Sequence, residues 1–114
     1  MKIDDYRFGS IRVEGHTYAS DVIISPDGVN DSWWRERGHE VCPADLEPIW
    51  EAKPEILIVG TGAYGEMRVV PETVEACRER GIEVAEGRTG DVVERFNNAA
   101  ESGEPFAACF HLTC

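Results

Sequence analysis

Three glycines follow a short apolar run with the spacing G-x-G-x-x-G, at Gly60, Gly62 and Gly65. In dinucleotide-binding proteins this spacing lets the backbone approach a pyrophosphate that lies on the N-terminus of a helix beginning within the motif. Here the next helix signal is Pro71, and residues 67–70 have the pattern of an extended segment. We therefore interpret the glycines first as a strand-to-loop turn, and second as a loop that faces an anion or another ligand.

A cluster of aromatic and basic residues, which includes Trp34, Arg35 and His39, interrupts an otherwise acidic chain. Aromatic residues with arginine are enriched in the binding hot spots of protein interfaces. The alternative is a tryptophan that packs on the core with an arginine alongside. Arg35, His39 and Arg68 could add positive charge to the glycine loop if the fold brings them near. The candidate ligand or partner surface comprises Trp34, Arg35, His39, Gly60, Thr61, Gly62, Tyr64, Gly65 and Arg68.

The cysteines form no C-x-x-C pair, and their spacing predicts no metal site. In a terminal strand Cys109 and His111 would share one face while Cys114 lies on the other, so the three could not ligate together. Cys42 precedes a short helix, where a helix dipole can lower a thiol pKa, and His39 is a conceivable partner. We favour inert structural thiols, and we predict no catalytic constellation and no cofactor.

The elements that would position these residues begin with antiparallel strands. Residues 6–8 and 10–13 alternate apolar and polar side chains, and residues 22–25 form a stronger strand that ends at the turn residues 26–28. Asp45 is the expected N-cap of a short helix. Residues 56–59 are a continuous apolar run, which is typical of a strand covered on both faces.

A strand, helix and strand follow the glycine loop. A proline, early acids, late arginines and a final glycine predict a helix over residues 71–81, before a strand at 82–85. Thr89 is the expected N-cap of the last helix, and residues 106–114 predict a buried central strand. We predict one α/β domain spanning residues 1–114, with three layers, a mixed central sheet, N-terminal antiparallel strands and a βαβ unit.

The net charge of −11 arises from 22 acidic and 11 basic residues. This charge repels phosphate backbones and anionic lipid, so we expect neither nucleic acid nor membrane as a partner. No apolar run approaches the ~20 residues of a membrane span, and no secretory signal is apparent. We expect a cytoplasmic monomer or homodimer.

Several segments together resemble one family of small proteins, and the terminal His-Leu-Thr-Cys is the most distinctive of them. They are Trp34-Arg35, Gly38-His39, Asp45-Leu46, residues 54–65, Pro71-Glu72, Gly81-Ile82-Glu83-Val84, Thr89, Phe96-Asn97 and His111-Leu112-Thr113-Cys114. This family includes the adipogenesis-associated domain protein and the third assembly factor of mitochondrial complex I. The resemblance implies a three-layer α/β fold with a mixed sheet, no established enzymatic activity and no known cofactor.

Two classes of function remain. The first is a non-enzymatic interaction or assembly protein that binds a protein partner. The second is a small-molecule or anion-binding protein, possibly an enzyme, that uses the loop at residues 60–65.

Overall fold

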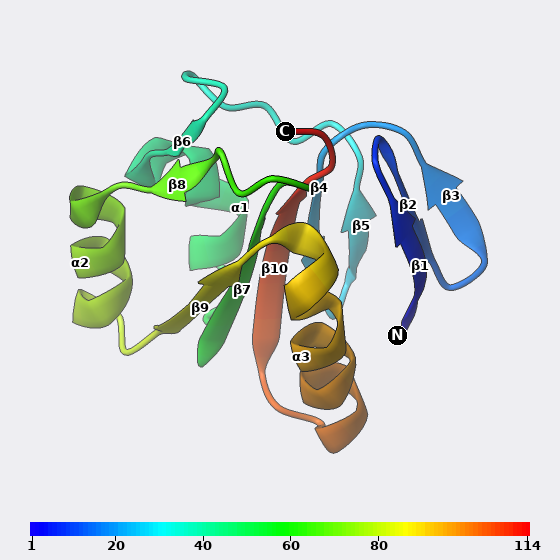
Figure 1. Ribbon diagram of the computed structural model, residues 1–114. Coiled ribbons are helices and arrows are strands. Elements are labelled where there is room, and N and C mark those ends of the chain that lie inside the picture. The colour runs from blue at the N-terminus through cyan, green and yellow to red at the C-terminus, as the bar shows by residue number, and fades with distance from the viewer.

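Five strands form the central sheet of the computed structural model, which describes residues 1–114 (Figure 1). Their order is β5 (Gly28–Asn30), β4 (Val22–Ser25), β10 (Phe106–His111), β7 (Ile56–Thr61) and β9 (Glu83–Gly87). β10, β7 and β9 are parallel, whereas β4 is antiparallel to both β10 and β5. The mixed sheet and the central position of the C-terminal strand are therefore confirmed.

A separate antiparallel sheet contains β1 (Ile3–Arg7), β2 (Ser10–Val13) and β3 (His16–Tyr18). The sequence predicts these strands and residues 22–25 as one antiparallel unit. In the structure β4 instead leaves this unit and pairs with β10, because its apolar residues are buried on both faces of the central sheet.

Two helices cover opposite faces of the central sheet (Figure 1). α3 (Thr89–Ser102) packs with the β1–β3 sheet on one face, where Phe96 contacts the rings of Phe106 and Phe110. α2 (Pro71–Glu79) lies on the other face with η1 (Pro43–Leu46) and α1 (Glu47–Trp50), over Leu57 and Val59 of β7. These two cores make the predicted three-layer arrangement.

Two expected helix caps are wrong. Asp45 lies inside η1, and its carboxylate accepts hydrogen bonds from the backbone N–H groups of Glu36 and Cys42. Cys42 is the N-cap, so the aspartate accepts the N–H of the N-cap residue from a position inside the helical turn. Thr89 is the first residue of α3, and Arg88 precedes it as the N-cap. The Thr89 hydroxyl is buried and serves a tertiary contact instead.

The parallel strands all end at one edge of the sheet. The chain leaves β7 toward α2 on one face, after the short strand β8 (Arg68–Val69), which pairs in parallel with β6 (Glu40–Val41). It leaves β9 toward α3 on the other face. Neighbouring strands whose connections diverge in this way form a topological switch point, the usual ligand crevice of open α/β sheets.

Candidate functional site

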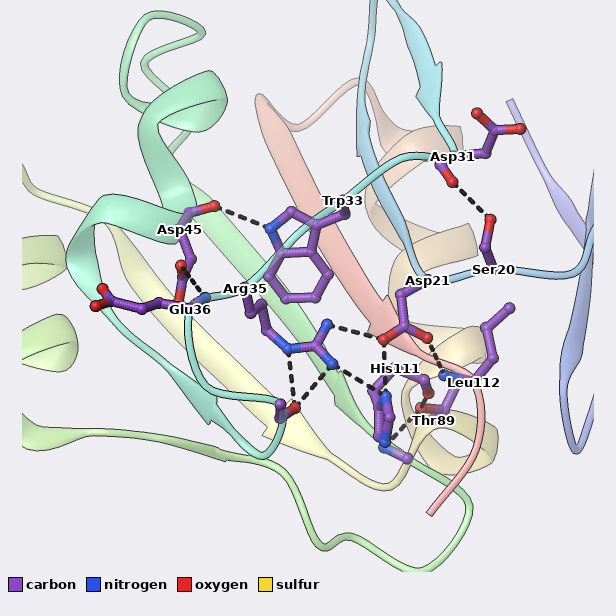
Figure 2. A network of polar contacts seen from close by, with 12 residues as sticks. Ser20, Asp21, Asp31, Trp33, Arg35, Glu36, Asp45, Thr89, His111 and Leu112 are labelled. Carbon is purple, nitrogen blue, oxygen red and sulfur yellow. Dashed lines mark hydrogen bonds and ion pairs between the residues drawn. The ribbon is translucent and has the colours of Figure 1, made fainter.

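A buried polar cluster lies at this edge, where β4 begins and β10 ends (Figure 2). Asp21 immediately precedes β4, and its carboxylate lies 2.8 Å from Nδ1 of His111 and 2.8 Å from Nη1 of Arg35. Its second oxygen accepts a hydrogen bond of 2.9 Å from the backbone N–H of Leu112. The antiparallel pairing of β4 with β10 brings these groups together across 90 residues of sequence.

Arg35 is held on several sides. Its guanidinium donates to the carbonyl of Gly38 through Nε at 3.0 Å and Nη2 at 2.8 Å, and it lies 4.5 Å from the ring centroid of Trp33. Its side chain is only 7% exposed, so the charge depends on Asp21 for compensation. The residue is thus a buried structural cation and contributes no free positive charge to a ligand.

The pKa of Asp21 reflects this environment. Burial raises the pKa of its carboxyl, but hydrogen bonds from His111 and the Leu112 N–H, together with the adjacent Arg35 guanidinium, outweigh burial and lower the pKa below its usual value. Asp21 is therefore ionised at neutral pH. The 2.8 Å contact then assigns a proton to Nδ1 of His111, since a carboxylate only accepts hydrogen bonds. The approach of Arg35 Nη2 to the same nitrogen, at 3.3 Å, is then a contact between two donors and not a hydrogen bond.

The other ring nitrogen of His111, Nε2, is buried and has no hydrogen-bond partner. An aspartate that orients a histidine is one half of a catalytic triad, but no nucleophile hydrogen-bonds this nitrogen. The exposed ring of His39 lies against the His111 ring, with centroids 5.6 Å apart. The geometry is that of a structural cluster which ties the loop of Arg35 to the end of β10.

The glycine loop closes the switch point with bonds from the chain itself. The Thr89 hydroxyl accepts a hydrogen bond from the Gly62 N–H and donates one to the His111 carbonyl, while the Thr89 N–H donates to the Gly62 carbonyl. The C-terminal segment completes the closure. The backbone N–H of Ala63 donates to the Thr113 carbonyl, and the N–H of Glu66 donates to the Cys114 carbonyl. None of the five principal hollows of the surface is lined by residues 60–65.

Two of the glycines are required by packing. A Cβ on Gly60 would lie 2.6 Å from Phe110 Cδ1 and 2.7 Å from Thr89 Oγ1. Gly62 has a φ of +104°, and a Cβ there would lie 2.5 Å from the carbonyl carbon of Cys114. Both spacings are far below ordinary van der Waals contact, so the motif is a backbone requirement of this fold. α2 begins only at Pro71, as the late helix signal predicts.

The structure places the candidate residues in three regions: beside His111, in the loop at residues 60–65, and on the surface at Trp34. Arg35 and His39 meet His111, and the backbone N–H of Arg68 donates to the carbonyl of His39. The exposed guanidinium of Arg68 forms an ion pair with Glu40, which also pairs with Arg37. Thr61 donates to the Gly87 carbonyl at the switch point.

Tyr64 and Trp34 are the large hydrophobic members of the set that are exposed. Tyr64 is 65% exposed and lies beside Phe8, with ring centroids 6.0 Å apart. Trp34 is 75% exposed, whereas its neighbour Trp33 is buried and donates its indole N–H to the carbonyl of Asp45.

Trp34 borders a hollow of about 190 Å³ that the loop at residues 60–65 does not reach. A second hollow, of about 230 Å³, adjoins it along Ile23, Asn30 and Pro48, which line both. The two hollows follow the terminal strand β5. Among the candidate residues, Trp34 is the exposed aromatic side chain that adjoins an apolar recess.

The sequence does not predict Asp21, and it singles out His111 only beside the cysteines and within the terminal segment that carries the family resemblance. A single aspartate before an apolar strand is the one local signal at Asp21, and such residues are common at strand starts. The partnership becomes apparent only through the register, in which Val22 lies opposite Phe110.

These features define a class of protein. It is a three-layer α/β protein with a closed switch point and an exposed tryptophan at the rim of a surface hollow. The chain belongs to the family described as protein of unknown function (DUF498/DUF598), whose model matches residues 3–111. This match confirms that the chain belongs to a family of small proteins, as the sequence segments indicate.

Solved structures with the same fold include a conserved hypothetical protein from Pyrococcus horikoshii, with 27% identity, all of both chains covered and a TM-score of 0.81. A protein from Xanthomonas campestris has a TM-score of 0.82 at 19% identity, over 96% of this chain and 83% of the other. A Mth938-like domain from Bordetella pertussis has a TM-score of 0.69 at 20% identity, over 97% and 85%. None of the helices is both long enough and apolar enough to cross a membrane.

Proposed function

We propose that this chain is a non-enzymatic interaction or assembly protein that binds a protein partner through the surface around Trp34. The observation that carries the proposal is the 75% exposure of this tryptophan at the rim of a hollow. An exposed indole leaves a large apolar area in contact with water, which binding to a partner would bury. Tryptophan is also among the residues most enriched in interface hot spots.

The second class of function, binding of a small anion at residues 60–65, has less support. The loop N–H groups of Gly62 and Ala63 are already hydrogen-bonded within the chain. Of the expected positive charges, Arg35 is paired with Asp21, and Arg68 shares Glu40 with Arg37. The resemblance to the third assembly factor of mitochondrial complex I supports the first class, because that relative is linked to the assembly of other chains.

A photo-cross-linking side chain in place of Ser32, an exposed residue that lines the same hollow and leaves Trp34 intact, tests the proposal in an extract of the source cells. We expect a discrete cross-linked product from position 32 and none from position 74. Val74 is the matched control, because it is an exposed apolar residue on α2. Equal products from both positions, or none from either, would contradict the proposal.

A further inference from the structure

The two ends of the central sheet differ in how they are protected. β9 is terminal at one end and carries the exposed acids Glu83 and Glu86. β5 is terminal at the other end, and its residues Gly28, Val29 and Asn30 carry no charge. Natural proteins place charges on exposed sheet edges to prevent pairing with other chains. The outer side of β5 lacks this protection and has no pairing strand within the protein.

The surface beside β5 is apolar in its floor and acidic at its rim. Ile23 and Ile49 are buried beneath the two hollows, and no lysine or arginine lines either of them. Asp27 and Glu36 line the hollows, are exposed and form no ion pair. Since the whole chain carries a net charge of −11, this face attracts a basic partner and repels a second copy of itself.

Trp34 adds a third, independent feature. The chain has three tryptophans, and two of them are covered by an arginine of the same chain. Arg35 lies 4.5 Å from the ring centroid of Trp33, and Arg80 lies 4.2 Å from that of Trp50. Trp34 has no such cation over its ring and is exposed. Its free face is suited to a lysine or arginine from another molecule.

We propose that an extended, basic segment of a partner protein adds to the outer side of β5. Its backbone pairs with β5, apolar side chains on one face enter the two hollows, and its lysines or arginines meet Asp27, Glu36 and the ring of Trp34. Addition of a strand supplies main-chain hydrogen bonds, and the pockets beside the edge supply specificity. This inference rests on the proposed function and specifies the chemistry of the partner.

The test uses a dye-labelled peptide of about seven residues that alternates valine with lysine or arginine, with its binding to the full chain followed by fluorescence anisotropy. We expect binding that weakens as salt is added, and a peptide with glutamate in place of the basic residues should bind about tenfold more weakly or less. Equal binding of the basic and acidic peptides would overturn the inference.

Backbone methylation of the peptide tests strand addition without altering the protein. Successive N–H groups along a strand point to opposite sides, so methylating alternate amides blocks one edge of the peptide only. The two complementary methylated peptides should differ in affinity by about tenfold or more, because each lost hydrogen bond weakens binding several-fold. Equal affinities of the two, whether strong or weak, would overturn strand addition.

Protein variants locate the binding surface. Trp34→Ala should weaken peptide binding about fivefold, and so should Asp27→Asn combined with Glu36→Gln. Glu83→Gln combined with Glu86→Gln makes the same change of charge on β9 and should have no effect. If the Glu83 and Glu86 variant weakens binding as much as the Asp27 and Glu36 variant, the inference is wrong.

The cross-linking experiment separates this inference from the proposed function. A cross-linked partner at position 32 together with failure of the peptides would overturn the strand addition and leave the interaction function standing. Loss of both results would overturn both.

Discussion

Replacing Asp21 by asparagine should destabilise the protein markedly, because it leaves the Arg35 cation buried without a counter-charge. Arg35 is 7% exposed and the Asp21 side chain is 18% exposed. Removing one partner of a fully buried ion pair costs about 3–5 kcal/mol, and the partial exposure of Asp21 reduces our expected loss to about 2–4 kcal/mol. Asparagine can still accept the hydrogen bond from the Leu112 N–H, so the loss reports mainly the charge.

The assay is urea unfolding at neutral pH, with Asp27→Asn as the control. Asp27 is exposed in a turn and forms no ion pair, so its variant changes the net charge equally, with an expected effect within about 0.5 kcal/mol. A loss at Asp21 no larger than the loss at Asp27 would refute the reasoning.

The stability difference between wild type and Asp21→Asn should also depend on pH, in a direction that the pKa of Asp21 sets. The folded pKa of Asp21 lies below its ordinary value, so the carboxylate stabilises the fold fully above the unfolded pKa of about 3.9. This stabilisation is lost as the pH falls through the folded pKa. The difference in unfolding free energy between wild type and Asp21→Asn should therefore shrink below about pH 4; a difference that stays constant would count against the assignment.

Three other predictions concern the glycine loop and the thiols. Gly62→Ala should cost more than about 3 kcal/mol in urea unfolding, since a Cβ would meet the C-terminal backbone at positive φ, whereas Gly38→Ala has open space and should change little. Thr89→Val should cost about 1–3 kcal/mol, because two buried hydrogen bonds lose their hydroxyl; a neutral effect would contradict the role of this group in closing the loop. Burial and Asp45 raise the pKa of the Cys42 thiol, and burial raises that of Cys109, so mass spectrometry should find Cys42 alkylated no faster than free cysteine and Cys109 alkylated only on unfolding.

Much of the architecture was predictable because it depends on local patterns. The continuous apolar run of β7, the proline and charges of α2, and the apolar residues of β10 each identify an element from adjacent residues. The distance from the glycine loop to Pro71 was also enough to argue against a dinucleotide site. These signals are read within one element, so no knowledge of its neighbours is needed.

The site depended on contacts between distant residues. Nothing local distinguishes Trp33 from Trp34, yet one is buried and donates a hydrogen bond to Asp45 while the other is exposed. The expected cap at Thr89 was wrong because its hydroxyl is used by Gly62, 27 residues away. A hydrogen bond of this kind carries no periodic signal in the chain.

The sequence by itself determined the main elements, their order and the family, because hydrophobic periodicity and capping residues act within a few positions of one another. Only the tertiary structure decided that Asp21, Arg35 and His111 form one cluster, that the glycine loop is closed, and that β5 is a terminal strand of the central sheet. Strand register and packing set these features, and both depend on which distant segments meet when the core is buried.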